Sequence, residues 1–341
     1  MSTAPEILTV DPVHPEPAII ARAAEIIRAG GLVGMPTETV YGLAANALDP
    51  AAIGRIYAAK GRPSHNPLIA HVADAKGAQQ LAAEWPIMAQ ALAKRFWPGP
   101  LTLVVRRKAM VPTELTAGLD TFGVRVPDHP VALALIRACG FPIAAPSANK
   151  FTEVSPVTAQ QVARGLGSAV NLILDAGRTR VGIESTVVDV SGATPVILRP
   201  GMISREAIEA VVGPTGRAST PISATAARPA PGMIERHYAP RAHVRLFETS
   251  DMPNALLEAR ALAASGKAIG LVLCTLAMPR DLGFAFASQL GDDPKWYAAG
   301  LYDALHSADA VHCEQLFIEE PPAIPAWDAI RDRLQRSAHP G

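Results

Sequence analysis

Cations and amides cluster in one short segment of the sequence, Lys-Gly-Arg-Pro-Ser-His-Asn from residue 60. Lys60 and Arg62 stand two residues apart, and Asn66 and His71 follow them. An arginine forms a planar bidentate fork and a lysine acts as a point charge, so two such cations together suit a polyphosphate. The alternative is a solvated helix end, where Lys60 would interact favourably with the helix dipole. Two prolines stiffen this loop, which favours a binding role.

Hydroxyl groups gather at a second place, the segment Pro-Thr-Glu-Thr-Val-Tyr-Gly-Leu that starts at residue 36. Thr37, Glu38 and Thr39 directly follow the apolar run 32–35, which we predict to be a strand. Loops carried on a rigid sheet are where binding and catalytic groups concentrate. The two segments together predict one half of a pocket for a small anion.

Further polar residues stand at predicted strand ends. Ser147 and Asn149 follow the apolar run 143–145, although Ser-x-Asn is also a common turn. Arg125 lies within the apolar strand Phe-Gly-Val-Arg-Val, where burying an unpaired guanidinium would be very costly. Its partner is then either a ligand in a cavity or a structural carboxylate. Glu-Ser-Thr opens another strand at residue 184, and Arg-Pro-Gly closes one at residue 199.

The elements that must position these residues are those of an α/β protein. Helices and strands are interleaved unevenly up to residue 212, which favours a mixed sheet over a doubly wound repeat. Beyond residue 242 the order βαβαβ predicts a small parallel sheet of Rossmann type without a Gly-rich phosphate fingerprint. Its expected strands are 244–247, 268–274 and 310–317, and its expected helices are 253–264 and 296–308.

Residues 213–242 are rich in Pro, Gly, Ser, Thr and Ala, which predicts a linker. We therefore expect a catalytic domain over 1–212, this linker, and a C-terminal domain over 243–341. Linkers usually avoid aromatic residues, so Tyr238 is expected to dock on a domain surface or on a ligand. His237 and His243 lack the spacing and the neighbouring ligands of a zinc site, and we expect no metal site built by the protein.

The totals fit two domains of ordinary composition, since the chain has 341 residues of which 49% are hydrophobic and 18% charged. The chain has 31 Lys plus Arg and 31 Asp plus Glu, so it has no net positive charge that would attract nucleic acid. Three widely spaced cysteines predict inert core thiols in a reducing compartment. With no signal peptide or membrane span in the sequence, we expect a cytoplasmic protein.

The motifs Pro-Thr-Glu-Thr-Val-Tyr-Gly-Leu, Lys60-x-Arg62 and Ser147-x-Asn149 resemble, in this order, those of the YrdC-type threonylcarbamoyl-AMP synthases. The resemblance covers about residues 15–212, and His-Tyr-Ala-Pro with the added domain resembles the long, two-domain form of that family. It implies formation of L-threonylcarbamoyladenylate and pyrophosphate from L-threonine, bicarbonate and ATP. The product serves threonylcarbamoyl-adenosine modification of tRNA beside the anticodon, through a downstream threonylcarbamoyl transferase. A weak contact with tRNA is also implied.

The resemblance also implies roles for individual residues. The threonine ligands would be Thr39, His71, Arg125, Ser147 and Ser185, with Arg125 as a carboxylate clamp. The ATP ligands would be Lys60, Arg62, Asn66, Thr121, Ala145 through its backbone, Asn149, Ser155, Arg199 and Tyr238. Lys60 and Arg62 would also stabilise charge during catalysis. No general base stands out, so we expect catalysis by positioning and electrostatics, with Mg²⁺ held mainly by the ATP phosphates and Tyr238 closing as a lid.

Two other functions compete with this interpretation. One is an RNA-binding module without ATP turnover, for which the run Arg-Arg-Lys at residue 106 supplies a local basic patch. The other is a carbamoyl-transfer domain of the hydrogenase-maturation type. Proteins of that type usually carry acylphosphatase and zinc-finger segments, and neither is visible in the sequence.

Overall fold

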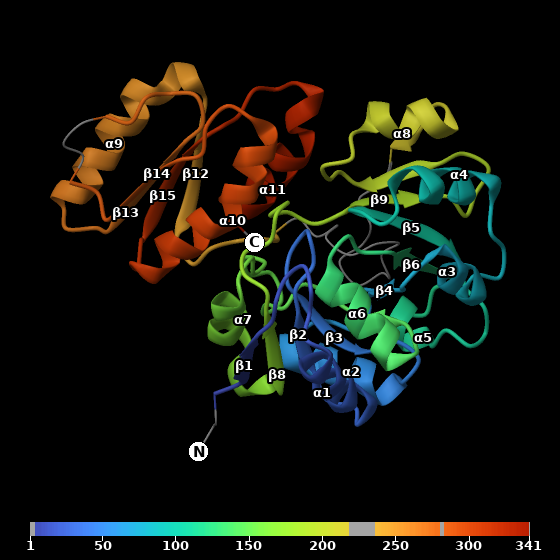
Figure 1. Cartoon of the computed structure of the whole chain (residues 1–341). Helices are drawn as coiled ribbons and strands as arrows, with labels where there is room; N and C mark the ends of the chain where they lie inside the picture. The colour runs from blue at the N-terminus through green and yellow to red at the C-terminus, as the bar shows by residue number, and fades with distance from the viewer. Residues whose placement is uncertain (1–3, 218–235, 280–282, 341) are drawn as a thin grey trace. The chain divides into compact units, whose positions relative to one another are not determined.

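The computed structural model describes residues 4–217, 236–279 and 283–340 (Figure 1). The chain divides into two compact units, which we describe separately. The first unit comprises Met1–Phe151, Pro156–Arg180 and Glu184–Met233. The second comprises Thr152–Ser155, Val181–Ile183 and Ile234–Gly341.

The first unit is built on a mixed sheet of eleven strands. β2 pairs antiparallel with β3 but parallel with β8. In the same way, β4 pairs antiparallel with β7 but parallel with β6. This arrangement confirms the predicted mixed sheet. In spatial order the strands are β1 (Glu6–Thr9), β8 (Leu172–Asp175), β2 (Val33–Met35), β3 (Gly42–Asn46), β7 (Ile143–Ala144), β4 (Ile69–His71), β6 (Thr121–Arg125), β5 (Leu101–Arg106), β9 (Thr186–Asp189), β10 (Val196–Arg199) and β11 (Gly216–Arg217).

Helices cover this sheet and complete two buried clusters. α1 (Pro17–Arg28) and α6 (Pro130–Cys139) pack together over β2, β3 and β8. The other helices contribute to a second and larger cluster. They are α2 (Pro50–Lys60), α3 (Ala75–Leu81), α4 (Ile87–Phe96), α5 (Thr113–Thr116), α7 (Ala159–Leu166) and α8 (Arg205–Val212), with the short 3-10 turn η1 (Gly167–Ala169).

The two clusters lie on opposite faces because side chains alternate along each strand. In β8, Leu172 and Leu174 belong to the cluster under α1 and α6, and Ile173 between them belongs to the other. In β3, Ala44 and its neighbour Leu43 separate in the same way. Both faces of the sheet are therefore buried, and polar side chains are left for the strand ends.

Helix α2 delivers the predicted cationic segment, and its ends follow the expected signals. The Asp49 side chain accepts from the backbone N–H of Ala51 at the N-cap, and Pro50 occupies the first turn. Gly61 ends the helix at φ +61°, a left-handed conformation that glycine adopts without strain. The helix stops there, so that Lys60 stands in its last turn and Arg62 in the loop that follows.

The second unit contains a four-stranded parallel sheet, as predicted, in the order β12 (His243–Phe247), β15 (Gln315–Glu319), β13 (Ile269–Leu273) and β14 (Phe286–Gln289). In Figure 1, α9 (Met252–Ala264) lies on one side of this sheet, and α10 (Pro294–Ala310) and α11 (Asp328–Ala338) lie on the other. Two 3-10 turns, η2 (Thr249–Asp251) and η3 (Pro325–Trp327), precede α9 and α11.

Some elements were missed or misplaced by the sequence interpretation. The strand expected at 310–317 starts at Gln315, because the Ala-rich α10 continues to Ala310. β3, α7, β14 and α11 were not predicted at all. All three cysteines are free and buried, and burial raises the pKa of the Cys139 thiol to about 11.

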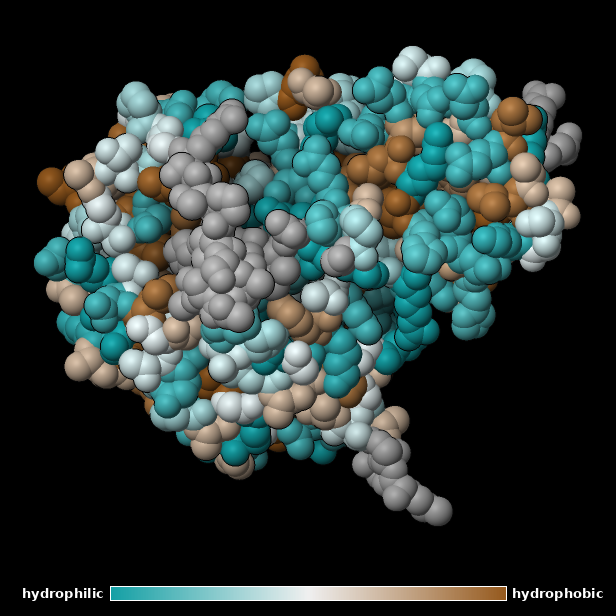
Figure 2. Space-filling view, turned by 180° about the vertical axis from the view of Figure 1, so that it is seen from behind, coloured by the Kyte–Doolittle hydropathy of each residue, from teal (hydrophilic) through white to brown (hydrophobic). Residues whose placement is uncertain are grey.

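Hydrophilic side chains cover much of the face shown in Figure 2, with hydrophobic ones in scattered groups. Across the described ranges, the helices are all too short or too polar to cross a bilayer.

A buried carboxylate fixes the loop after β13. The Glu319 carboxylate at the end of β15 is fully buried and accepts from the backbone N–H groups of Cys274, Thr275 and Leu276 at 2.7, 3.1 and 3.2 Å. The hydroxyls of Thr275 and Thr249 donate to its other oxygen. Hydrogen bonds to a charged acceptor are the stronger kind. Glu319 therefore joins β15 to the loop after β13, in addition to the backbone hydrogen bonds that pair the two strands.

We expect Glu319→Gln to lower the free energy of unfolding of the second unit by about 2–4 kcal/mol, because an amide nitrogen would face backbone donors. Hydrogen exchange of the β13 and β15 amides measures this loss. The matched control is Glu320→Gln, whose ion pair with Arg331 is partly exposed and should contribute at most about 1 kcal/mol. Equal exchange rates in the two variants would contradict the assigned role of Glu319.

Candidate active site

Two loops that carry predicted site residues lie side by side in the first unit. The loop after β2 carries Thr39, and the loop after β7 carries Ser147. An isolated antiparallel bridge joins Gly42 to Ser147. The backbone N–H of Ala148 also donates to the carbonyl of Tyr41 at 2.8 Å. These backbone contacts fix the positions of the two hydroxyl-bearing loops relative to each other.

Arg125, the last residue of β6, has only 4% of its surface exposed. Its Nη2 lies 2.6 Å from Oε1 of the equally buried Glu38, its Nη1 donates to Oγ1 of Thr39 at 3.0 Å, and its Nε donates to the carbonyl of Gly99 at 3.2 Å. The structural carboxylate that the sequence left open as a partner is therefore present. A guanidinium has five N–H groups, so it retains capacity for a ligand as well.

Ser185 lies directly before β9, whose first residue pairs with the start of β5. Its hydroxyl lies 2.8 Å from the hydroxyl of Thr102 and accepts from Nη2 of Arg199 at 3.2 Å. Nε of Arg199 donates to the Ser185 carbonyl at 3.1 Å. The turn before β5 accepts from Arg125, and Thr102 within β5 contacts Ser185, so the arginines at the ends of β6 and β10 are both anchored, directly or through Ser185, to the first part of β5.

Lys60 contacts the loop after β7. Its ammonium donates to the carbonyls of Ser147 and Asn149 at 2.5 and 2.6 Å, and only 2% of the residue is exposed. The backbone carbonyl of Lys60 accepts from the N–H of Phe151 at 2.8 Å. Lys60 is thus a buried cation that holds a site loop, which differs from the solvated helix end considered above.

Arg62 stabilises the loop that follows α2 by hydrogen bonds within that loop. Its Nε donates to the carbonyl of Asn66 at 3.0 Å, and its Nη2 donates to Oδ1 of Asn66 and to the carbonyl of Pro67 at 2.7 and 2.9 Å. The guanidinium also lies over the ring of Phe151, 5.8 Å from its centroid. Nδ2 of Asn66 is buried and has no hydrogen-bond partner among the residues that the structure describes.

His71 lies beside Arg125, because the two residues are paired in the parallel register of β4 and β6. Burial lowers the pKa of His71 to about 3, and the positive charge of Arg125 adds to this shift. The imidazole is therefore neutral near pH 7. Its Nδ1 is buried without a partner in the described part of the chain. His71 is thus a hydrogen-bonding group of the site and adds no positive charge to it.

Within the described ranges, two further predicted residues of the first unit make no side-chain hydrogen bond with these groups. Thr121 occupies the opposite end of β6 from Arg125, about 13 Å along the strand at ~3.3 Å per residue. Ala145 is buried after β7, and its backbone N–H already donates to Ile69 at 3.2 Å. Ala145 therefore has only its carbonyl left to contact a ligand through the backbone.

Ser155 and Tyr238 belong to the second unit. Tyr238 is buried at φ +60°, a strained conformation for a non-glycine residue. Its ring stacks on Tyr302 at a centroid distance of 5.8 Å, and the Arg333 guanidinium lies 5.0 Å from its centroid. The carbonyl of Ser155 contacts Nε2 of His306 at 3.2 Å. Residues 218–235 of the expected lid lie outside the described residues, and the lid stays a prediction.

Two further residues of the site were not predicted to have a role in it, although a sequence motif or a predicted strand contains them. Glu38 stands in Pro-Thr-Glu-Thr, and Thr102 stands in an apolar strand. Both are buried, and each bonds a predicted ligand residue. The signal for Glu38 was available, because a buried Arg125 calls for a carboxylate, but the sequence does not say which of the 31 acidic residues is close to it.

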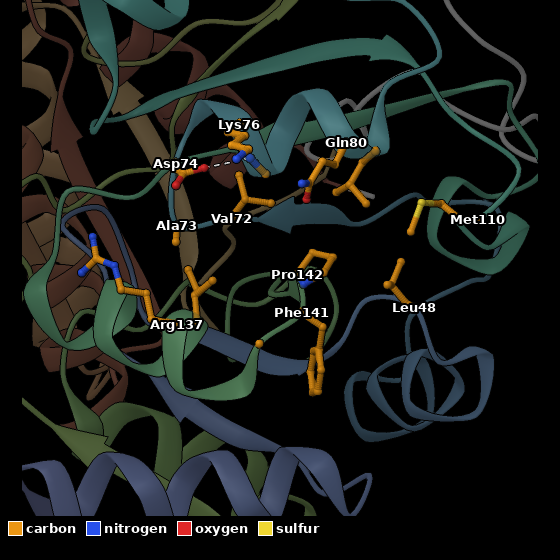
Figure 3. A pocket seen from close by; sticks show the side chains of 14 residues that line it. Leu48, Val72, Ala73, Asp74, Lys76, Gln80, Met110, Arg137, Phe141 and Pro142 are labelled. Carbon is orange, nitrogen blue, oxygen red and sulfur yellow. Dashed lines mark hydrogen bonds between the residues drawn. The ribbon is translucent and has the colours of Figure 1, made fainter.

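A separate hollow of about 440 Å³ opens between the loop after β4, α3 and the end of α6 (Figure 3). Its charged lining residues are Asp74, Lys76 and Arg137, and Leu48 and Met110 stand on its other side. None of the predicted site residues lines it. The hollow is therefore distinct from the buried network around Arg125.

The chain matches two family models that together span most of its length. Residues 25–201 match the model described as "Telomere recombination", for the Sua5, YciO and YrdC proteins. Residues 203–339 match the model described as "Threonylcarbamoyl-AMP synthase, C-terminal domain".

Curated relatives resemble the chain over nearly its whole length. It is 42% identical to the threonylcarbamoyl-AMP synthase of Bacillus subtilis over 94% of this chain and 92% of that one. It is also 42% identical to the synthase of Pyrococcus abyssi, over 93% of each chain. The crystal structure of P. abyssi Sua5 with L-threonine superposes at a TM-score of 0.90, with 40% identity and 97% coverage of both chains.

The neutral state of His71 predicts acid sensitivity. Between pH 6.5 and about 3, His71 takes up a proton in the unfolded chain but not in the folded one, so its contribution to stability is lost as the pH falls. One such proton contributes a slope of up to ~1.4 kcal/mol per pH unit. We expect His71→Gln to reduce the pH dependence of the free energy of unfolding in this window. Urea unfolding at several pH values measures the slope.

The control for this measurement is His14→Gln, because His14 is exposed. It should leave the slope as in the wild type. A His71→Gln slope equal to that of the wild type would contradict a neutral buried imidazole.

Proposed function

This chain belongs to the threonylcarbamoyl-AMP synthase family, and we propose that its first unit binds L-threonine and ATP through the buried network around Arg125. The enzyme is a nucleotidyltransferase that forms L-threonylcarbamoyladenylate and pyrophosphate from L-threonine, bicarbonate and ATP, for the modification of tRNA beside the anticodon. The observation that carries our residue assignment is that hydrogen bonds and strand pairing join hydroxyls, cations and a neutral imidazole from separate strand ends.

The reaction brings anions together. The threonine amine condenses with bicarbonate to give a carbamate and water, and a carbamate oxygen then attacks the α-phosphorus of ATP while pyrophosphate leaves. Carbamate and triphosphate repel each other, so the site must screen negative charge and hold the attacking oxygen in line. Cations fixed before the substrates arrive do this without reorganising during the reaction.

We assign the threonine end of the site to the residues around β6. The N–H groups of Arg125 that are not bonded to the protein face the threonine carboxylate, and the neutral His71 beside it supplies a hydrogen bond without adding charge. Thr39, Ser147 and Ser185 place further hydroxyls on the loops next to Arg125. Their fixed contacts to the protein orient these groups before threonine binds.

We assign the ATP end to the cationic loops. Lys60 and Arg62 face the phosphates and stabilise the charge that develops on pyrophosphate. Arg199 joins this end to the threonine end through Ser185. The remaining residues of the first unit that we assign to ATP are Asn66, Thr121, Ala145 and Asn149, and the ATP contacts implied for Ser155 and Tyr238 stay predictions.

Mg²⁺ would reach the site on ATP. Magnesium prefers hard oxygen ligands in an octahedral arrangement, and it is commonly held by phosphates and water with few protein carboxylates. The side chains assigned to the phosphates are cations and amides, which fits a metal carried by the nucleotide. Bound Mg²⁺ would neutralise part of the phosphate charge during the attack.

We keep the boundaries of the expected domains at 1–212 and 243–341, with the linker between them. We further propose that the product passes to a tRNA-modifying threonylcarbamoyl transferase, with a weak contact to tRNA. A mixed anhydride hydrolyses readily, so a nearby acceptor is needed. The use of ATP and the three free thiols support a cytoplasmic location.

We expect Lys60→Ala to lower kcat/KM for ATP by about 100-fold or more, because a fixed cation and two loop contacts are lost together. Pyrophosphate release is measured with L-threonine, bicarbonate and ATP each omitted in turn. The wild type should release pyrophosphate only when all three are present. Lys94→Ala is the matched control, since Lys94 is an exposed lysine in the last turn of α4.

Two outcomes would contradict this proposal. One is wild-type activity that does not need threonine and bicarbonate. The other is salt-dependent RNA binding without ATP turnover, which would favour the RNA-binding alternative.

A further inference from the structure

The Glu38 carboxylate has no role in the assignments above, although it lies at their centre. Only 1% of Glu38 is exposed, and its Oε1 lies 2.6 Å from Nη2 of Arg125. Its Oε2 is buried and has no hydrogen-bond partner among the residues that the structure describes. A carboxylate has about four acceptor positions, so a single ion pair leaves most of its capacity unused. Buried polar atoms in this condition are rare and call for an explanation.

The groups near Glu38 do not satisfy Oε2. The Thr37 hydroxyl is 2.9 Å from the Thr39 hydroxyl and donates to the carbonyl of Val40 at 2.6 Å. The ring of His129 is close enough to interact electrostatically with Glu38, but its Nδ1 accepts from the backbone of Val131. Burial lowers the pKa of His129, so the ring is neutral near pH 7 and provides no second cation.

We propose that Oε2 of Glu38 accepts a hydrogen bond from the α-ammonium of L-threonine, so that Glu38 and Arg125 together recognise the amino acid as a zwitterion. This inference rests on the proposed placement of threonine at Arg125. The two charges of an α-amino acid are one carbon apart, and the two charges of the protein are in direct contact. Carboxylate on Arg125 and ammonium on Glu38 therefore match in sign and spacing.

The pairing also explains how a charged substrate enters a buried site. Burying an isolated ion is costly, whereas a neutral ion pair that receives a neutral zwitterion gains partners for all four charges. A ligand that carries only the carboxylate would meet the negative charge of Glu38 without compensation. Glu38 thus selects α-amino acids over hydroxy acids of the same shape.

The test combines a protein change with a ligand change. Calorimetric titrations compare L-threonine with 2,3-dihydroxybutanoate, which replaces the ammonium by a hydroxyl, on the wild type and on Glu38→Gln. The wild type should bind threonine at least 100-fold more tightly than the analogue. In Glu38→Gln this ratio should fall to below about tenfold, because the negative charge that attracts the ammonium is lost.

The pH dependence supplies a readout that a merely structural role would not change. Wild-type affinity for threonine should fall as the ammonium of the ligand loses its proton at alkaline pH, and Glu38→Gln should lack that fall. The titratable groups next to the pair are His71, which lies beside Arg125, and His129, which interacts electrostatically with Glu38; Asp128 and Arg180 act on His129 in turn. Burial lowers the pKa of both histidines, so they are already neutral at alkaline pH, and we assign the change to the ligand.

Glu84→Gln, an exposed acid outside the helices, is the control and should change neither ratio nor profile. The inference is overturned if Glu38→Gln weakens both ligands equally, since Glu38 would then act only by holding Arg125. If Glu38→Gln does not fold, the wild type alone decides, because equal affinity for threonine and the analogue also overturns it. A wild type that binds no threonine overturns the proposed function too, whereas threonine-dependent pyrophosphate release with an unchanged ratio overturns only the role of Glu38.

Discussion

The buried ion pair between Arg125 and Glu38 is the interaction on which the first unit depends. Through it, the end of β6 is tied to the loop after β2, and the third contact of the guanidinium ties both to the turn before β5. Removal of either partner would leave an uncompensated buried charge, which typically destabilises a protein by about 3–5 kcal/mol. The pair is therefore a structural joint as well as a group that can meet a substrate.

The other cations of the site follow the same pattern. Lys60 holds the loop after β7 through two carbonyls, and Arg199 holds the segment before β9 through Ser185. Each of these cations is fixed by the backbone before any ligand arrives. Such preorganisation is what electrostatic catalysis requires, because charge that is already in position need not be moved in the transition state.

Much of this arrangement could be predicted from the sequence, where the signals are local. The strand around Arg125 was predicted to within one residue, and the mixed character of one sheet and the parallel character of the other were predicted correctly. β3 was missed because Gly-Leu-Ala-Ala-Asn has no β-branched residue, and it forms a strand only through its neighbours β2 and β7. The strand expected from residue 310 began too early because helix propensity continues through that alanine.

Contacts between residues far apart in the chain could not be predicted from the sequence. The partner of Arg125 is 87 positions earlier in the chain, and no spacing rule connects the two residues. The grouping of Thr152–Ser155 and Val181–Ile183 with the second unit was equally hidden, because these segments are too short to carry a pattern of their own. Only the folded chain shows which strand ends meet.

Glu319 has a consequence for what the C-terminal unit can hold. In an open parallel sheet, phosphates are usually received at the carboxyl ends of the strands by free backbone N–H groups. Here three such groups after β13 are already bound to a carboxylate from the same fold. A nucleotide phosphate could bind these three N–H groups only by displacing the buried Glu319 carboxylate. The carboxylate thus occupies, at the carboxyl end of β13, the position that a phosphate would take.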